Sequence, residues 1–335
     1  MVDIVYRYSQ KSCFNIRSPK KSNLALIMSA DQLNYIRFWG VRGSYPAPFG
    51  SHMRVGGNTS CVELRVDDHI LICDGGSGII PLGNALMAQQ DIKEVTILLT
   101  HYHWDHISGL PFFVPAFVPG WKINIYGPGE SQQEIERRIS GQMIDPYFPV
   151  EVETWMADIH YLKDDYSQLS YGPFEIEKFN VHHPGSTFGY RIQVHDKTIV
   201  YASDNELKFI EKAIADRSDE MSDKELQLIN AMQAEELATA LETIRDAHVF
   251  IHDAQYTPED YAKKRGWGHS CFRDTANFAA DANVKQLFLF HVDPNYDDTK
   301  IEGLHRAAIK LLLERHSTMD CHIAREGLIL NLDKL

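Results

Sequence analysis

Apolar residues occur along the chain mainly as short runs separated by turn-forming residues. Three of these runs, at residues 70–73, 95–99 and 286–290, contain almost no polar side chain. Runs of this length, rich in β-branched and aromatic residues, are typical of buried strands. Residues 61–66 alternate between apolar and polar side chains instead, which predicts a half-buried strand. Further strands are expected at residues 35–40, 123–126, 174–179, 190–194, 198–201, 249–252 and within 321–332.

Helical spacing is found between these strands. Helices are expected at residues 131–140, 272–283 and 304–316, and a short one from Ile80 to before Asp91. The acidic segment 206–246 contains Ser222-x-x-Glu225, the spacing of a capping box at a helix start. Leucine and isoleucine residues follow at roughly helical spacing. We therefore expect a helical insertion there, which packs as an arm or mediates formation of a homodimer.

The pattern of strands and helices in the first half of the chain recurs in the second half. In both halves, polar candidates for the site stand at strand ends. This duplication predicts an α+β architecture of two mixed sheets packed face to face, with helices outside and the site where the halves meet. Residues 35–335 are expected to form this domain. Residues 1–34 break the pattern and are expected to be an N-terminal leader or extension, with Met28 as a second candidate for the start of translation.

Charge and composition narrow the classes of partner. The 335 residues carry a formal net charge of −13, which disfavours a broad surface for long nucleic acid. A small anionic substrate stays open, because metal ions supply local positive charge. No apolar run reaches the roughly 20 residues that span a bilayer, so no membrane partner is expected. The five cysteines show no CxxC spacing and the N-terminus no signal-peptide pattern, so we expect free thiols in a reducing cytoplasm.

The strongest chemical signal lies directly after the strand at residues 95–99. His101, His103, Asp105 and His106 fall within six residues there. Neutral imidazole and carboxylate are the usual protein ligands of zinc and similar divalent ions. Four such donors exceed the need of a single catalytic ion, which must keep one coordination position open. The cluster therefore predicts two metals.

Three more donors stand at strand–loop junctions in the second half, namely His183, Asp204 and His291. The completed sets are His101, His103 and His183 for one metal, and Asp105, His106 and His291 for the other. Asp204 would bridge the two metals, because a carboxylate has two oxygens. A water between two cations has a lowered pKa and becomes hydroxide near neutral pH. Of the other histidines, His182 is expected to point away from the metals and His252 to lie in the core.

Taken in order, these motifs resemble the metallo-β-lactamase superfamily over residues of about 35 to 335. The matching positions are Asp74-Gly75-Gly76, His101-x-His103-x-Asp105-His106, His183, Asp204 and His291. The resemblance implies an αββα sandwich with a dinuclear metal site, and it implies that Asp74 hydrogen-bonds a ligand histidine. Zinc is the first expectation for both metals, with manganese or iron as alternatives. Asp204 stands where the antibiotic-hydrolysing lactamases usually have a cysteine.

A second motif favours one branch of that superfamily. Gly268-His269-Ser270, together with Asp253, resembles the phosphodiesterase branch that includes ribonuclease Z, in which an acidic residue and a histidine form a proton-donating pair. Asp253 stands where that pattern has glutamate. The resemblance implies catalytic roles for His269 as general acid, for Asp253 as its orienting partner and for Asp105 at the metals.

The sequence thus predicts a metal-dependent phosphodiester hydrolase with a hydroxide held between two metals. A small or cyclic nucleotide is the expected substrate, because the long basic arm of ribonuclease Z is not recognisable and the net charge is −13. The alternatives are a ribonuclease Z-like RNA endonuclease, a thioester hydrolase like glyoxalase II, and a non-catalytic scaffold with the same fold. Arg42 and Asn58 are candidate substrate contacts, and Tyr102 and Trp104 are expected to pack beside the site.

Overall fold

The protein is described here from a computed structural model. The structure describes residues 34–89, 92–163, 168–209 and 221–335. The chain divides into two units, Met1–Gln32 and Leu33–Leu335, and all described residues belong to the second. The predicted leader, with Met28 in it, therefore lies outside the described residues apart from Asn34.

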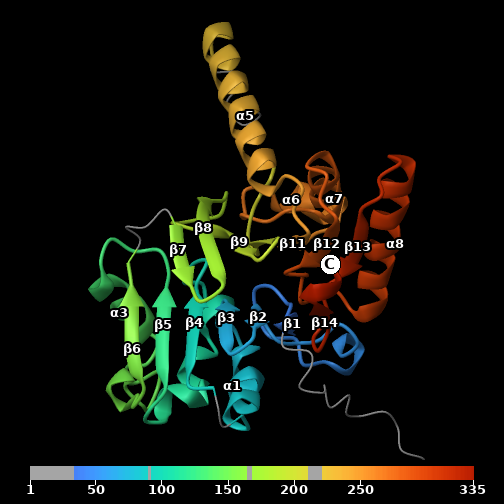
Figure 1. Cartoon of the computed structure of the whole chain (residues 1–335). Helices are drawn as coiled ribbons and strands as arrows, with labels where there is room; N and C mark the ends of the chain where they lie inside the picture. The colour runs from blue at the N-terminus through green and yellow to red at the C-terminus, as the bar shows by residue number, and fades with distance from the viewer. Residues whose placement is uncertain (1–33, 90–91, 164–167, 210–220) are drawn as a thin grey trace, which may run out of the picture. The chain divides into compact units, whose positions relative to one another are not determined.

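Two seven-stranded sheets form the body of this described part (Figure 1). The first sheet, in the order β14-β1-β2-β3-β4-β5-β6, consists of β1 (Tyr35–Gly40), β2 (Cys61–Val66), β3 (His69–Cys73), β4 (Glu94–Leu98), β5 (Lys122–Tyr126), β6 (Asp158–Leu162) and β14 (Ile329–Asn331). The strands from β3 to β6 are parallel, while β14, β1, β2 and β3 pair antiparallel.

The second sheet repeats this mixture of parallel and antiparallel pairs. In the order β13-β12-β11-β10-β9-β8-β7 it consists of β7 (Gln168–Tyr171), β8 (Phe174–Asn180), β9 (Phe188–Val194), β10 (Lys197–Ala202), β11 (Val249–Asp253), β12 (Gln286–Phe290) and β13 (Asp320–Ile323). The strands from β10 to β13 are parallel, and those from β7 to β10 are antiparallel. The prediction of two mixed sheets is confirmed.

Helices pack on both sheets, with α1 and α3 against the first and α7 and α8 against the second. The helices are α1 (Ile79–Met87), α2 (Trp104–Ile107), α3 (Gln132–Ser140), α5 (Asp223–Ile244), α6 (Pro258–Lys264), α7 (Phe272–Asp281) and α8 (Asp298–Glu314). Single 3-10 turns occupy Gly50–His52, Leu110–Phe112, Val114–Phe117, Val152–Thr154 and Leu332–Lys334. The predicted helices are all present among the described residues, and α2 and α6 were not predicted.

Side-chain caps explain where these helices begin. The Ser222 hydroxyl accepts a hydrogen bond from the Glu225 N–H, and the Glu225 carboxylate accepts one from the Ser222 N–H, so the predicted capping box is confirmed. Helix α8 begins earlier than the predicted start at residue 304. The reason is a cap that the apolar pattern did not reveal, because the Asp297 carboxylate accepts a hydrogen bond from the Lys300 N–H at 2.7 Å.

Strand β3 shows why several strands are continuous apolar runs. Leu71 belongs to the core between the two sheets, where the rings of Phe38 and Phe288 lie 5.3 Å apart. Ile70 and Ile72 belong to a second apolar cluster, which includes residues of α1 and α3. Successive side chains of a strand point to opposite faces. Because both faces of this strand are covered, all of its side chains are apolar except at its partly exposed start.

Helix α5 is the least buried of the described helices. Its Leu228 and Met232 side chains are 62% and 59% exposed, whereas Ile244 at its C-terminal end is buried. The helix is therefore anchored at that end and accounts for the later part of the predicted insertion at residues 206–246. Residues 210–220 of that insertion lie outside the described residues.

Two expectations from composition can be compared with the structure. Cys61, Cys73, Cys271 and Cys321 are free thiols in buried positions, as predicted. Among the described residues, no helix combines the length and the apolar character that a membrane crossing requires.

A hydrogen bond between the sheets provides a test of the packing. The Tyr190 hydroxyl, in β9, donates to the backbone oxygen of Leu99, just after β4, at 2.6 Å. Because Tyr190 is fully buried, Tyr190→Phe should lower the free energy of unfolding by about 1–3 kcal/mol, measured by urea unfolding. The control Tyr147→Phe, at a side chain 82% exposed, should change it by less than about 0.5 kcal/mol. Equal losses in the two variants would contradict this role of Tyr190.

Candidate metal centre

The candidate donors stand where strands end at one edge of the sheets. Strands β10, β11 and β12 are parallel neighbours, so their carboxyl ends lie together. Asp204 comes two residues after β10, Asp253 ends β11, and His291 directly follows β12. From the first sheet, β4 leads into residues 101–106, the last of which form α2. The fold therefore gathers donors that are far apart in the chain.

All seven predicted donors meet at this edge in two groups. Within each group, the potential ligand atoms lie within 4.8 Å of one another. The groups are His101, His103 and His183, and Asp105, His106, Asp204 and His291. They correspond to the two sets that the sequence predicts, with Asp204 counted in the second.

Asp204 lies between the two groups. Its Oδ2 is 3.8 Å from His101 Nε2 and 3.7 Å from His183 Nε2. Its Oδ1 is 3.1 Å from His106 Nε2 and 3.3 Å from His291 Nε2. The two oxygens of one carboxylate thus face different groups, which is the arrangement that a bridging ligand requires.

Unpartnered buried atoms show that these residues fit a pair of divalent metal ions. His101 Nε2 and Asp204 Oδ1 are buried and have no hydrogen-bond partner among the described residues. Buried polar atoms of this kind are unfavourable unless a partner satisfies them. A divalent cation in each group would satisfy them, and imidazole with carboxylate is a suitable donor set.

Asp74 holds two of the ligand segments in place, as the resemblance implied. His106 Nδ1 donates to Asp74 Oδ2 at 2.8 Å, which leaves His106 Nε2 to face the donors. The Thr100 N–H and the Tyr201 hydroxyl each donate to the same carboxylate at 2.8 Å. Asp74 has a φ of 63°, a left-handed conformation that non-glycine residues seldom adopt. The contacts from both sheets maintain this conformation.

Hydrogen bonds also orient two further rings. The Nδ1 of His183 donates to the backbone oxygen of Gly268 at 2.9 Å. The Nδ1 of His101 lies 3.0 Å from the Thr100 hydroxyl oxygen, which itself hydrogen-bonds Asp74. In both rings Nε2 is the nitrogen left for a metal.

Burial and charge set the protonation states of the donors. Burial holds the pKa of His101 well below its ordinary value and lowers the pKa of His183 to about 4. Both rings are therefore neutral, the form that binds a metal. Burial opposes the charged form of Asp204, but His106 outweighs it, so the pKa of Asp204 lies well below its usual range. Burial also opposes charge on His106, whose pKa is nevertheless raised by Asp204 and its neighbours. The carboxylates of Asp105 and Asp204, which lie beside Nε2 of His106, would likewise favour a metal cation bound to that nitrogen.

The predicted acid pair is formed beside the donors. His269 Nδ1 donates to Asp253 Oδ2 at 2.7 Å, and Asp253 is fully buried. The His269 ring lies 5.0 Å from the ring of His183 and 5.1 Å from that of His291. Burial lowers the pKa of His269, but the Asp253 carboxylate outweighs it and the pKa is raised. The shorter aspartate therefore reaches the histidine without loss of the contact.

Glu206 is a residue of the site that the sequence did not reveal. Its buried carboxylate accepts hydrogen bonds from the Gly266 N–H at 2.7 Å and the Gly268 N–H at 2.9 Å. At Gly268, φ is +88°, and a Cβ would lie 2.4 Å from His183 Nδ1. Glu206 thus holds the loop that presents His269. The spacing Asp204-x-Glu206 could have indicated a second acidic residue at the site. The role of Glu206 depends, however, on its contact with a loop about 60 positions later in the chain.

One predicted substrate contact, Arg42, is wrong, and the other, Asn58, stays a prediction. Arg42 is fully buried and donates to the backbone oxygens of Gly56 and Tyr296, each at 2.7 Å. Asn58 donates from Nδ2 to Glu326 at 3.0 Å. The Arg42 side chain thus turns inward and connects loops to one another, whereas Asn58 is only partly buried.

The aromatic residues near the donors also differ from expectation. Trp104 does not pack beside the site, because its side chain is 76% exposed at the start of α2. Trp267, which precedes Gly268 and His269, is 61% exposed and was not predicted to act. Tyr102 does pack, beneath the guanidinium of Arg138 at 5.1 Å. Two large apolar rings therefore stand in solvent next to residues of the candidate centre.

Comparison with known proteins agrees with this geometry. The family model described as "Beta-lactamase superfamily domain" matches residues 80–292. A ribonuclease Z of Picrophilus torridus is 24% identical over 326 residues, which cover 89% of this chain and 96% of that protein.

Solved structures show the same fold. The metallo-beta-lactamase fold protein YhfI from Bacillus subtilis has a TM-score of 0.57 at 18% identity, and the match covers 88% of this chain and 98% of YhfI. Unliganded yeast PDE1 also has a TM-score of 0.57, at 17% identity, with 90% of this chain and 99% of PDE1 covered. Each likeness extends over nearly the whole of the known chain.

The position of Asp204 allows a test of the two-metal arrangement. Asp204→Asn keeps the size of the side chain but removes its charge and one of its two ligand oxygens. We expect the metal content of the purified protein to fall from about two ions per chain to one or fewer. Asp298→Asn, which changes a buried carboxylate that belongs to no group of possible metal ligands, should retain the wild-type content. Elemental analysis showing equal metal in Asp204→Asn and wild type would contradict a bridging role.

Proposed function

The chain belongs to the beta-lactamase superfamily and is a metal-dependent hydrolase of phosphodiester bonds, and we propose that its substrate is a small or cyclic nucleotide. The contact between His269 and Asp253, at 2.7 Å and next to the two groups of donors, carries the assignment of phosphodiester hydrolysis, and the net charge of −13 supports a small substrate. Hydrolysis of an alkyl phosphodiester requires a proton for a poor leaving group, and this pair can supply it.

We assign the metal-binding roles to the seven donors. His101, His103 and His183 would hold one ion, Asp105, His106 and His291 the other, and Asp204 would join both. Zinc is the proposed metal, with manganese or iron as alternatives. When bound, a divalent pair activates water and neutralises charge on the phosphate oxygens.

His269 would hold the proton that the leaving oxygen needs. The Asp253 carboxylate accepts the hydrogen bond from Nδ1, so Nε2 is the nitrogen that can face a substrate. The Gln255 N–H at 2.9 Å and the Ser270 N–H at 3.2 Å both donate to the other oxygen of Asp253 and keep that carboxylate oriented. The same pair argues against thioester hydrolysis, because a thiolate leaves without a proton donor of this kind.

Trp104 and Trp267 support a nucleotide as the substrate. Their side chains, 76% and 61% exposed, stand one residue after His103 and two residues before His269. Exposed aromatic rings stack on nucleobases, each with a typical contribution of about 1–3 kcal/mol. We infer that the nucleoside of a phosphodiester held at the metals stacks on one of these rings.

The general-acid role is tested with His269→Ala. We expect turnover of a 3′,5′-cyclic nucleotide to fall roughly 10²–10⁴-fold, because its alkoxide leaving group needs a proton. Bis-p-nitrophenyl phosphate has a good leaving group and should be affected less. Metal content should remain that of the wild type. Undiminished turnover of the cyclic nucleotide would contradict the role of His269.

The nucleotide assignment is tested with Trp267→Ala. Thymidine 5′-p-nitrophenyl phosphate and methyl p-nitrophenyl phosphate share a leaving group and differ in the nucleoside. The variant should raise KM for the first substrate by about 5-fold or more, as expected for the loss of one stacked base, and leave KM for the second nearly unchanged. The same change in both KM values would argue that Trp267 does not contact the nucleoside.

A ribonuclease Z-like RNA endonuclease is the second candidate function. The ribonuclease Z relative, which this chain matches over 96% of its length, favours it, whereas the net charge of −13 disfavours a long RNA surface. Cleavage of a tRNA precursor with higher kcat/KM than any nucleotide, together with strongly salt-dependent binding, would decide for RNA. The cytoplasm as location and a homodimer through α5 stay predictions.

A further inference from the structure

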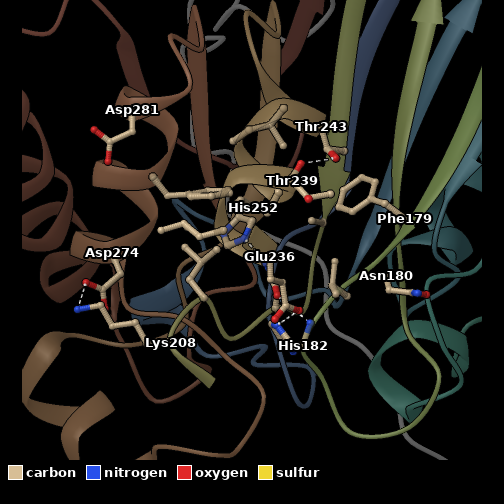
Figure 2. A pocket seen from close by; sticks show the side chains of 18 of the residues that line it. Phe179, Asn180, His182, Lys208, Glu236, Thr239, Thr243, His252, Asp274 and Asp281 are labelled. Atoms are coloured by element: carbon tan, nitrogen blue, oxygen red, sulfur yellow. Dashed lines mark hydrogen bonds and ion pairs between the residues drawn. The ribbon is translucent and has the colours of Figure 1, made fainter. Parts of the chain in front are cut away.

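A cavity of about 480 Å³ lies under the C-terminal half of α5 (Figure 2). Its wall comes from α5, from α7, from the end of β8 and from the loops after β8 and β10. None of the seven donor residues lines this cavity, and neither does His269. It is therefore a space distinct from the candidate metal centre.

The cavity nevertheless shares its wall with the metal centre. His182, Asn205 and His252 line it, and Figure 2 shows His252 between the side chains of α5 and α7. Their chain neighbours His183, Asp204 and Asp253 face the metal centre instead. In β11 strand alternation explains this, because His252 and Asp253 point to opposite sides of the sheet. The two sites thus lie on opposite faces of the same three segments.

Asn205 joins these segments by hydrogen bonds. Its side-chain oxygen accepts from the His182 N–H at 2.9 Å, and its side-chain nitrogen lies 3.1 Å from His252 Nε2. Its backbone oxygen accepts from the Ser270 hydroxyl at 2.6 Å, directly after His269. A displacement of Asn205 by a molecule in the cavity would therefore reach both the bridging Asp204 and the acid pair.

The wall chemistry identifies the kind of molecule that fits. Phe179, Phe250 and Phe278 contribute aromatic surface, and Ala240 and Ile244 of α5 face them across the cavity. Volumes of this size with a mostly apolar lining are typical of small-molecule sites.

The charged groups of the wall are already paired. His182 Nε2 lies 2.7 Å from Glu236 Oε1, and Lys208 Nζ lies 3.1 Å from Asp274 Oδ1, as the dashed lines in Figure 2 indicate. Asp281 pairs with Arg315 at 2.5 Å. A charged ligand would have to displace one of these partners, whereas an uncharged ligand would not.

We propose that this cavity binds an uncharged, largely apolar small molecule and that its occupancy changes turnover at the metal centre through Asn205. The binding is independent of the proposed function, and only the effect on turnover depends on it.

Binding is tested on the metal-loaded full chain with N-phenyl-1-naphthylamine, a neutral dye that fluoresces in apolar surroundings. We expect saturable one-to-one binding to the wild type. Ala240→Trp fills the cavity and should weaken binding about 10-fold or more, by loss of the volume that the dye occupies. Leu237→Trp, at a cavity residue 48% exposed, should do so with less risk to folding.

The matched control is Ala238→Trp on the exposed face of α5, outside the cavity. It should bind the dye as the wild type does. Equal binding by the wild type and both cavity variants, or no saturable binding to the wild type, would overturn the proposed site.

The effect on turnover is measured with thymidine 5′-p-nitrophenyl phosphate at saturating dye. We expect kcat to change about 5-fold or more in the wild type and in Ala238→Trp, and not in Ala240→Trp. Dye binding without any change in kcat would overturn the coupling to the metal centre. Because fluorescence is read without substrate, a chain that hydrolyses no diester would disprove the proposed function and leave the binding result to stand alone.

Discussion

The carboxylate of Asp204 is the group on which the candidate site depends. It is buried, and its two oxygens face different groups of histidine and aspartate side chains. A buried carboxylate without positive partners is strongly unfavourable, and so is a buried imidazole nitrogen without a hydrogen-bond partner, such as Nε2 of His101. The same geometry becomes favourable when divalent cations stand between these atoms. The surrounding loops hold the donor atoms in this arrangement.

The sheets position these groups because both faces of their central strands are covered. Burial on both faces makes most positions within these strands apolar, and the parallel order of β10, β11 and β12 places three strand ends that carry polar side chains together. Asp74 and His291, at φ values of 63° and 55°, depart from ordinary backbone conformation at strand ends. Hydrogen bonds to Asp74 from both sheets offset this strain locally.

Neighbouring residues of three segments face two different sites. His183, Asp204 and Asp253 face the metal centre, while the residues beside them line the cavity under α5. Asn205, linked to both sides, makes the wall a continuous hydrogen-bonded structure. A displacement of side chains in the cavity can therefore be transmitted to the metal centre through these hydrogen bonds. No movement of a whole domain is required.

The sequence by itself determined the two mixed sheets, the segment at residues 101–106, and the later donors His183, Asp204 and His291. These follow from local information, since apolar periodicity defines strands and dense donors at a strand end define a metal-binding chemistry. Only the tertiary structure decided that Arg42 is buried, that Trp104 is exposed, and that Glu206 holds the loop of His269. The direction of a loop side chain depends on partners that are tens to hundreds of positions away in the chain, and no local pattern contains that information.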